Sequence, residues 1–200
     1  MIFSRALFFL LVLARVGSVS AQDRAIVMID AGHGGEEVGV TTEDVLEKDM
    51  VLRVGFVLAE ELVSRGYDVR LTRTGDYDVP WPERREMAET AGASLLIMLH
   101  MNGDEDVSKH GIEIYANVED PVANHAAETM AASLRMLDTP VVVENRPWPF
   151  LQSPTVPTVM VEAGFLTHPV ERRLLKSPEY HRKLAARLAD GAVKGIQARR

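Results

Sequence analysis

Hydrophobic segments of two different periods alternate along this chain, and this alternation is the strongest limit on its fold. Short runs with strand character are followed by longer segments in which apolar residues recur every three or four positions. Strands that alternate with helices favour a largely parallel sheet in an α/β fold, and 200 residues is the length of a single domain. The predicted strands are residues 25–30, 67–72, 94–99, 158–161 and, as an edge strand, 111–116.

Four helices are predicted between and after these strands. They are expected to run from Glu47 to Gly66, from Pro82 to Gly92, over residues 124–137 and over residues 178–196. Residues 140–157 contain five prolines, so this stretch is predicted to be loop apart from one short strand.

The first 21 residues have the composition of an export signal. Arg5 precedes an apolar run at residues 6–14, and small residues follow before the expected cleavage point. The run is too short to span a bilayer, which takes roughly 20 apolar residues, although Arg15 directly after it leaves an uncleaved anchor open. We expect a signal peptide at residues 1–21, a catalytic domain at residues 22–200, and a periplasmic or secreted protein with no stable membrane insertion after cleavage.

Charge and cysteine content narrow the partners and ligands. The chain has 22 basic and 29 acidic side chains, and loss of the two arginines in the signal leaves 20 basic ones, a formal charge of −9. An acidic balance of this size disfavours nucleic acid as a partner. Because the chain has no cysteine, any metal site must use histidine and carboxylate ligands.

Four residues suited to metal and proton chemistry border the predicted strands and the first helix. They are His33 in IDAGHGG, Glu47 in LEKD, His100 in IMLHMN and Glu162 in VMVEAGF. In an open α/β sheet the ligand crevice lies outside the carboxyl ends of the strands, so residues distant in sequence meet there. Glu47 would join this crevice from the first turn of its helix.

Each of the four also has a plainer explanation. His33 could be a turn histidine bonded to backbone, although the three glycines beside it would let the backbone approach an ion or substrate. Glu47 could serve the helix dipole alone, and His100 could be an ordinary core histidine. Glu162 is the most informative, because a carboxylate on a buried strand is costly unless it is paired or bound to a cation.

Taken together, the four residues predict a hydrolytic metal site. Two histidines and one carboxylate are the ligand set of catalytic zinc sites that keep one position open for water. We therefore expect Zn²⁺ bound by His33, Glu47 and His100, with Glu162 as the general base.

Neighbouring polar residues receive weaker assignments. Asp30 and Asn102 could orient an imidazole, with local turn bonding as the alternative. The remaining histidines, which we expect in loops or on helix surfaces without a role, are His110, His125, His168 and His181.

Longer motifs that contain these residues follow one another over about residues 25–196. They are IVMIDAGHGG, EKDMVL, LLIMLHMN followed by GIEIY, and TVMVEAGFLTHPVERRLLKSPEY. With these motifs in this order, the chain resembles the zinc-dependent N-acetylmuramoyl-L-alanine amidases known as amidase type 3.

The resemblance implies a fold, a site and a substrate. The fold would be a mainly parallel twisted sheet with helices on both faces, and His33, Glu47 and His100 match the family's zinc ligands. Glu162 matches its catalytic glutamate. The substrate would be peptidoglycan, cleaved at the amide that joins the lactyl group of N-acetylmuramic acid to L-alanine.

The chain departs from the family pattern at three positions outside the ligand set. Glu37 replaces the usual aspartate after HGG, Met98 replaces the usual serine before the second histidine, and Gln152 stands where arginine is common. These changes bear on substrate preference. A zinc peptidase acting on stem peptides and a non-catalytic wall-binding protein remain the alternative functions.

Regulation is a further expectation from the resemblance. Division-linked members carry an extra helix over the zinc, between the edge strand and the catalytic glutamate, which an activator protein displaces. Here that interval, residues 117–161, holds one helix with the apolar spacing of a core element and a proline-rich remainder. We therefore expect no built-in plug and no activator protein. The alternative is a loop at residues 141–151 that covers the site with Trp148 and Phe150.

Overall fold

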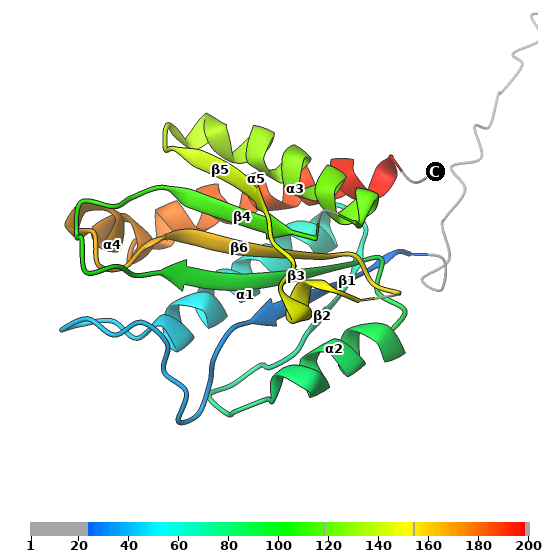
Figure 1. Cartoon of the computed structure of the whole chain (residues 1–200), viewed down its shortest axis with the longest axis horizontal. Coiled ribbons are helices and arrows are strands. Elements are labelled where there is room, and N and C mark those ends of the chain that lie inside the picture. Colours follow the sequence, from blue (N-terminus) through cyan, green and yellow to red (C-terminus); the bar gives the residue numbers. More distant parts are fainter. Residues whose placement is uncertain (1–23, 118, 154, 199–200) are drawn as a thin grey trace, which may run out of the picture.

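The computed structural model describes residues 24–117, 119–153 and 155–198, and this part of the chain forms one six-stranded sheet flanked by helices (Figure 1). From edge to edge the strands are β2 (Asp68–Leu71), β1 (Ile26–Ala31), β3 (Leu95–Asn102), β6 (Thr158–Phe165), β4 (Ile112–Ala116) and β5 (Val141–Asn145). The first four run parallel, β4 is antiparallel to β6, and β5 is parallel to β4. The predicted single-domain, mainly parallel α/β fold is confirmed.

Helices cover both faces of the sheet, as the resemblance implied. The five α-helices in the described residues are α1 (Glu47–Ser64), α2 (Trp81–Thr90), α3 (Pro121–Leu134), α4 (Pro169–Leu175) and α5 (Pro178–Gln197). In Figure 1, α1, α3 and α5 lie behind the sheet and α2 lies in front of it. A larger core joins the three rear helices to one set of strand side chains, and a smaller core joins α2 to the opposite set.

Successive side chains of the central strands point to opposite faces of the sheet. On β3, Leu95, Ile97 and Leu99 enter the larger core, whereas Leu96 and Met98 enter the smaller one. Because both sets are buried, the sequence of this strand is continuously apolar. The smaller core stops before the carboxyl ends of β3 and β6, so this face of the sheet is free to carry polar groups there.

The edge-strand prediction for residues 111–116 is wrong. β4 lies between β6 and β5, and the short strand expected in the proline-rich stretch, β5, is the true edge. β4 alternates because Ile112 and Ile114 face the larger core while Glu113 and Tyr115 face the other side. The alternation in β4 arises because one of its faces has polar neighbours, and it does not mark an edge strand.

Two strands are longer than predicted, which changes where the functional residues lie. β3 continues to Asn102 and β6 to Phe165, so His100 and Glu162 are within strands and do not end them. The two residues are direct partners in the parallel β3 and β6 register. Their side chains therefore lie side by side on one face of the sheet.

The helices also differ in detail from the prediction. α2 begins at Trp81, which makes Pro82 its second residue. α3 begins at Pro121 because the Asp120 carboxylate accepts hydrogen bonds from the first-turn N–H groups, and a 3-10 turn at Arg135–Leu137 completes the predicted segment. A second 3-10 turn lies at Pro149–Leu151. α4, whose amino end is capped by His168, was not predicted.

The predicted signal peptide at residues 1–21 lies outside the described residues. Among the residues that the structure describes, no helix combines the length and the apolarity needed to cross a bilayer.

Candidate active site

The four predicted site residues come from four different elements of the fold. His33 lies in the turn after β1, Glu47 is the first residue of α1, and His100 and Glu162 are register partners on β3 and β6. His33 has φ 60°, a left-handed conformation that is uncommon for a residue with a side chain. Such strain persists only where the surroundings impose it, and it is typical of functional turns.

Three of the four residues form a compact cluster of potential metal ligands. One ligand atom from each of His33, Glu47 and His100 lies within 4.8 Å of the other two. Glu47 Oε1 is 3.0 Å from His33 Nε2 and 3.1 Å from His100 Nδ1. The two imidazole rings meet edge to face with centroids 4.9 Å apart.

Glu47 is held as a carboxylate by more than the imidazoles. Only 2% of it is exposed, and its two oxygens accept the backbone N–H groups of Met101 (2.9 Å) and Val40 (2.8 Å). Burial alone would raise the pKa of Glu47, but hydrogen bonds from His100, His33 and Val40 outweigh it and lower that pKa to about 2. A ligand that is charged and fixed in place suits a divalent cation.

Glu162 stands beside this cluster in a different electrostatic state. Burial raises the pKa of Glu162 to about 7; His100 and His33 lower this pKa, Glu47 and Glu113 raise it, and burial is the largest contribution. Its Oε2 is buried and has no hydrogen-bond partner among the described atoms. A buried carboxyl whose oxygen is free to exchange a proton is suited to general acid and base work near neutral pH.

Glycines allow the ligands to pack this closely. A Cβ on Gly32 would lie 2.3 Å from the His100 ring, so the first glycine of the AGHGG turn makes room for a ligand side chain. Gly39, which was not singled out from the sequence, has φ 68° and also lies against the cluster. A Cβ there would be 2.4 Å from Glu47 Oε2 and 2.7 Å from His33 Nε2.

Replacing Gly39 with alanine is therefore expected to displace Glu47 or His33 and to weaken metal binding at least about tenfold, as typical changes around metal ligands do. Metal affinity measured by competition with a chelator checks this. Gly92→Ala is the matched control, because Gly92 has a similar φ of 63° but open space around its Cβ position. Equal losses of metal affinity in both variants would show that backbone strain alone is responsible.

Two buried arginines hold the turn that carries His33, and the sequence analysis missed both. Arg73 donates to the carbonyls of Ala31 and Gly32, each at 2.8 Å, and Arg84 donates to the carbonyl of His33 at 2.7 Å. A planar guanidinium spreads its N–H donors over a rigid fork and reaches acceptors on several sides, whereas a lysine donates from a single point. The sequence does not mark these two arginines, because most of their acceptors are backbone carbonyls and the carboxylate partner of Arg84, Asp30, is distant in sequence.

The expectation that Asp30 or Asn102 orients an imidazole is wrong. Asp30 Oδ1 accepts hydrogen bonds from Arg84 (2.7 Å) and Thr72 (2.6 Å), so it anchors the arginine that supports the turn. Asn102 Oδ1 accepts the N–H of Gly103, and Nδ2 donates to Glu113. Asn102 therefore belongs partly to local turn bonding, the stated alternative.

The histidines expected to have no role lie away from the cluster. His110 and His168 stack with centroids 5.3 Å apart, and His125 is on α3. His181 is buried, not on a helix surface as predicted, and its ring hydrogen bonds to the Leu175 carbonyl.

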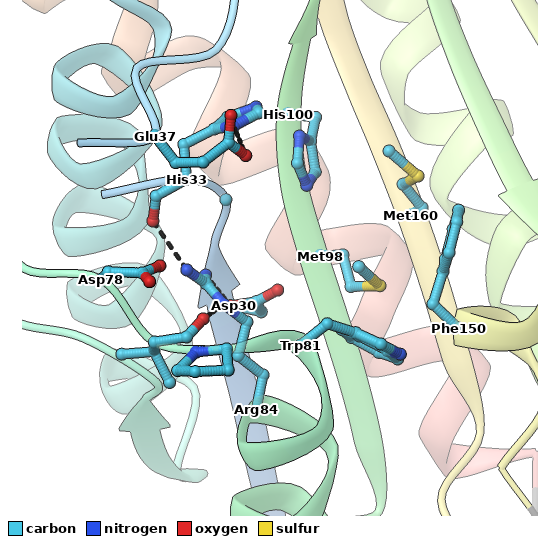
Figure 2. A pocket seen from close by; sticks show the side chains of 13 residues that line it. Asp30, His33, Glu37, Asp78, Trp81, Arg84, Met98, His100, Phe150 and Met160 are labelled. Atoms are coloured by element: carbon cyan, nitrogen blue, oxygen red, sulfur yellow. Dashed lines mark hydrogen bonds and ion pairs between the residues drawn. The ribbon is translucent and has the colours of Figure 1, made fainter. Parts of the chain in front are cut away.

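A cavity of about 260 Å³ adjoins the two histidines (Figure 2). Its wall is formed on one side by β1, the turn after it and the start of α2, and on the other by β3, β6 and the 3-10 turn at Pro149–Leu151. Its lining includes the side chains of Asp30, Trp81, Met98, Phe150 and Met160. Of the three departures from the family pattern, Glu37 and Met98 line this cavity, and Gln152 does not.

The fold and the site together define a class of protein. A mainly parallel α/β sheet that gathers two histidines and a carboxylate, with a second buried carboxyl beside them, has the parts of a metal-dependent hydrolase. The sequence matches the family model described as N-acetylmuramoyl-L-alanine amidase over residues 27–194. The chain belongs to this family.

Individual relatives agree with that membership. AmiA of Salmonella typhimurium, an N-acetylmuramoyl-L-alanine amidase, is 28% identical over 218 residues that cover 85% of this chain and 75% of AmiA. The solved structure of the amidase AmiC2 of Nostoc punctiforme is 28% identical with a TM-score of 0.79, covering 86% of this chain and 97% of that one. The CwlD amidase of Clostridioides difficile, solved in complex with the GerS lipoprotein, shares the fold at 22% identity and a TM-score of 0.77, over 88% of this chain and 100% of that one.

Proposed function

We propose that this chain hydrolyses peptidoglycan at the amide between the lactyl group of N-acetylmuramic acid and L-alanine. The observation that carries the proposal is the convergence of His33, Glu47 and His100 within 4.8 Å. Glu162, the register partner of His100, supplies a carboxyl beside that set. Membership of the amidase family supports the substrate and the bond.

Zinc is the metal we assign to the cluster. The ligand set of two imidazoles and one carboxylate is that of several catalytic zinc sites, and ligand atoms about 2.0–2.2 Å from a tetrahedral ion lie roughly 3.3 Å apart. The 3.0 and 3.1 Å separations between Glu47 Oε1 and the imidazole nitrogens support this fit. Zn²⁺ bound there would supply Lewis acidity to a water and to the amide carbonyl.

Glu162 performs the proton transfers in this proposal. It accepts a proton from the attacking water, and the same carboxyl then donates that proton to the nitrogen of L-alanine as the amide bond breaks. A carboxyl with a pKa raised to about 7 by burial can act in both directions near neutral pH, and a bound cation beside it would favour its charged form. His33 and His100 fix the reacting centre at the rim of the sheet.

Product analysis tests the proposal against a stem-peptide peptidase and a non-catalytic wall-binding protein. Purified chain is incubated with purified muropeptides, and the products are identified by mass spectrometry. An amidase leaves a free lactyl carboxyl on the sugar and an intact peptide that begins with L-alanine. A new carboxyl inside the peptide would instead indicate a peptidase, and unchanged muropeptides would indicate binding without turnover.

The location of the protein is part of the same proposal. A signal peptide at residues 1–21 would deliver the domain at residues 22–200 to the periplasm or outside the cell, where peptidoglycan lies. Sequencing the amino terminus of the exported protein tests the cleavage point.

We further propose that the enzyme needs no activator protein. In the described part of the interval 117–161, the one α-helix is α3, and its apolar residues are buried in the larger core. The alignment with AmiA spans 218 positions but includes only 85% of this 200-residue chain. AmiA therefore has additional residues inside the aligned region that this chain lacks. The purified chain should therefore degrade sacculi when it is alone, although CwlD is seen with a lipoprotein partner.

Changing Trp148 to alanine tests the competing idea that residues 141–151 form an inhibitory lid. Trp148 packs against Tyr115 and Phe150, with ring centroids 4.7 and 5.3 Å away, so it supports the cavity wall. We expect activity on sacculi to fall several-fold in Trp148→Ala and to stay unchanged in Phe56→Ala, an exposed aromatic on α1. A large gain of activity in Trp148→Ala would establish a lid and contradict this account.

A further inference from the structure

We propose that the cavity beside His33 and His100 binds the N-acetylmuramic acid ring, and that the stem peptide leaves the reacting centre in another direction. This inference rests on the proposed function, and it assigns one half of the substrate to a defined set of side chains. The proposed occupant of the cavity is the sugar, and the experiment distinguishes it from the stem peptide.

The position of the cavity is the first argument. In the substrate only the ether oxygen and one lactyl carbon separate the sugar ring from the carbonyl that is attacked. A subsite for the ring must therefore adjoin the metal-ligand cluster. The cavity of about 260 Å³ meets that condition, since His33 and His100 form part of its wall.

The apolar lining is the second argument. Trp81 and Phe150 face each other edge to face with centroids 5.8 Å apart, and Met98 and Met160 line the same cavity (Figure 2). The C–H faces of a pyranose pack well on aromatic rings, and binding cavities combine such surfaces with few polar groups. Methionine side chains can adapt around a ring and its acetyl group.

The polar floor of the cavity is the third argument. Asp30 is 1% exposed and bonded to Arg84 through Oδ1, yet its Oδ2 has no hydrogen-bond partner among the described atoms. Figure 2 places the Asp30 carboxylate between Arg84 and Met98. Met98, its register partner on β3, has a flexible side chain, so a small movement would let a hydroxyl or acetamido N–H donate to Oδ2.

Charge favours the sugar over the peptide. Three acidic residues, Asp30, Glu37 and Asp78, line the cavity, and the Arg84 guanidinium is occupied by Asp30 and by backbone carbonyls. A muramyl ring is neutral while its lactyl group is in amide linkage, and it offers hydroxyl and N–H donors. The carboxylates of a free peptide would be repelled by the same lining.

Tryptophan fluorescence tests the inference, because the chain has two tryptophans and only Trp81 lines the cavity. In Trp148→Phe, Trp81 is the sole reporter, and in Trp81→Phe, Trp148 is. The probe is the methyl glycoside of N-acetylmuramic acid with its lactyl carboxyl reduced to the alcohol, which is neutral and cannot be cleaved. We expect it to change the emission of Trp81 and to leave Trp148 nearly unchanged, and we expect free stem peptide to leave Trp81 unchanged. A peptide that changes Trp81 emission more than the sugar does, or a sugar with no effect on Trp81, overturns the inference.

A kinetic variant separates this inference from the proposed function. Phe150→Ala should lower kcat/KM for a muropeptide at least tenfold and leave kcat/KM for the matching lactyl peptide without sugar unchanged, with Phe56→Ala as the control. Equal losses on both substrates would mean that Phe150 is only structural and would contradict the subsite. If wild-type chain releases peptides from muropeptides but the sugar probe has no effect, the subsite fails and the amidase proposal stands. If the sugar binds but no substrate is cleaved, the amidase proposal fails and the subsite stands.

Discussion

Replacing Glu162 with glutamine should lower hydrolysis of muropeptides by a factor on the order of 10² or more. Glutamine keeps the size of the side chain but cannot exchange a proton, whereas burial beside the cluster raises the pKa of the Glu162 carboxyl to about 7. The variant should fold normally and keep its metal, because Glu162 is outside the three-residue ligand group. Turnover and metal content of the same preparation provide the measurement.

Glu113→Gln is the matched control for Glu162→Gln. Glu113 is the register partner of Glu162 on β4 and has the same side chain, but it bonds to Asn102 (2.8 Å) and Tyr115 (2.5 Å). Its substitution should reduce turnover much less. Loss of metal in Glu162→Gln would make Glu162 a ligand, and full turnover would assign the base to another group.

Changing His33 or His100 to alanine should remove the metal and, with it, activity. The purified chain is expected to contain about one zinc per molecule, and two remaining ligands hold such an ion poorly. Metal content after dialysis, determined by mass spectrometry, is the measurement. His110→Ala is the control, since His110 stacks on His168 away from the cluster.

Full zinc occupancy in either variant would contradict the ligand assignment. Loss of zinc in His110→Ala would indicate that metal is held elsewhere. Far-ultraviolet circular dichroism of each variant separates a lost ligand from a lost fold.

The sequence was sufficient to predict the fold class and to select four candidate residues that the fold brings together, because both leave strong local signals. Continuous apolar strands such as residues 94–99 predicted a sheet covered on both faces, and β3 is buried in that way. Histidines and acids at the ends of apolar runs predicted a shared crevice, and the structure places His33, Glu47 and His100 within reach of one ion. The chemical roles of these residues remain predictions.

The remaining features depend on contacts between distant segments, which local patterns do not record. The alternation of β4 is also typical of an edge strand, and only the pairing with β5 shows that β4 is internal. Arg73 and Arg84 bond to backbone carbonyls of the His33 turn, and the carboxylate partner of Arg84, Asp30, is distant in sequence, so no local pattern marks either arginine. Trp81 and Phe150 are far apart in sequence and become one cavity wall only after folding.

The most direct test of a metal-dependent amidase is release of dye-labelled fragments from purified sacculi by the purified chain alone. The measurement is made before and after treatment with a chelator, and again after one equivalent of zinc is returned. We predict release without any added protein, its loss after chelation, and its recovery with zinc. Release that persists at full rate in a chain shown to be free of metal would contradict the account, as would no release by the fully zinc-loaded chain.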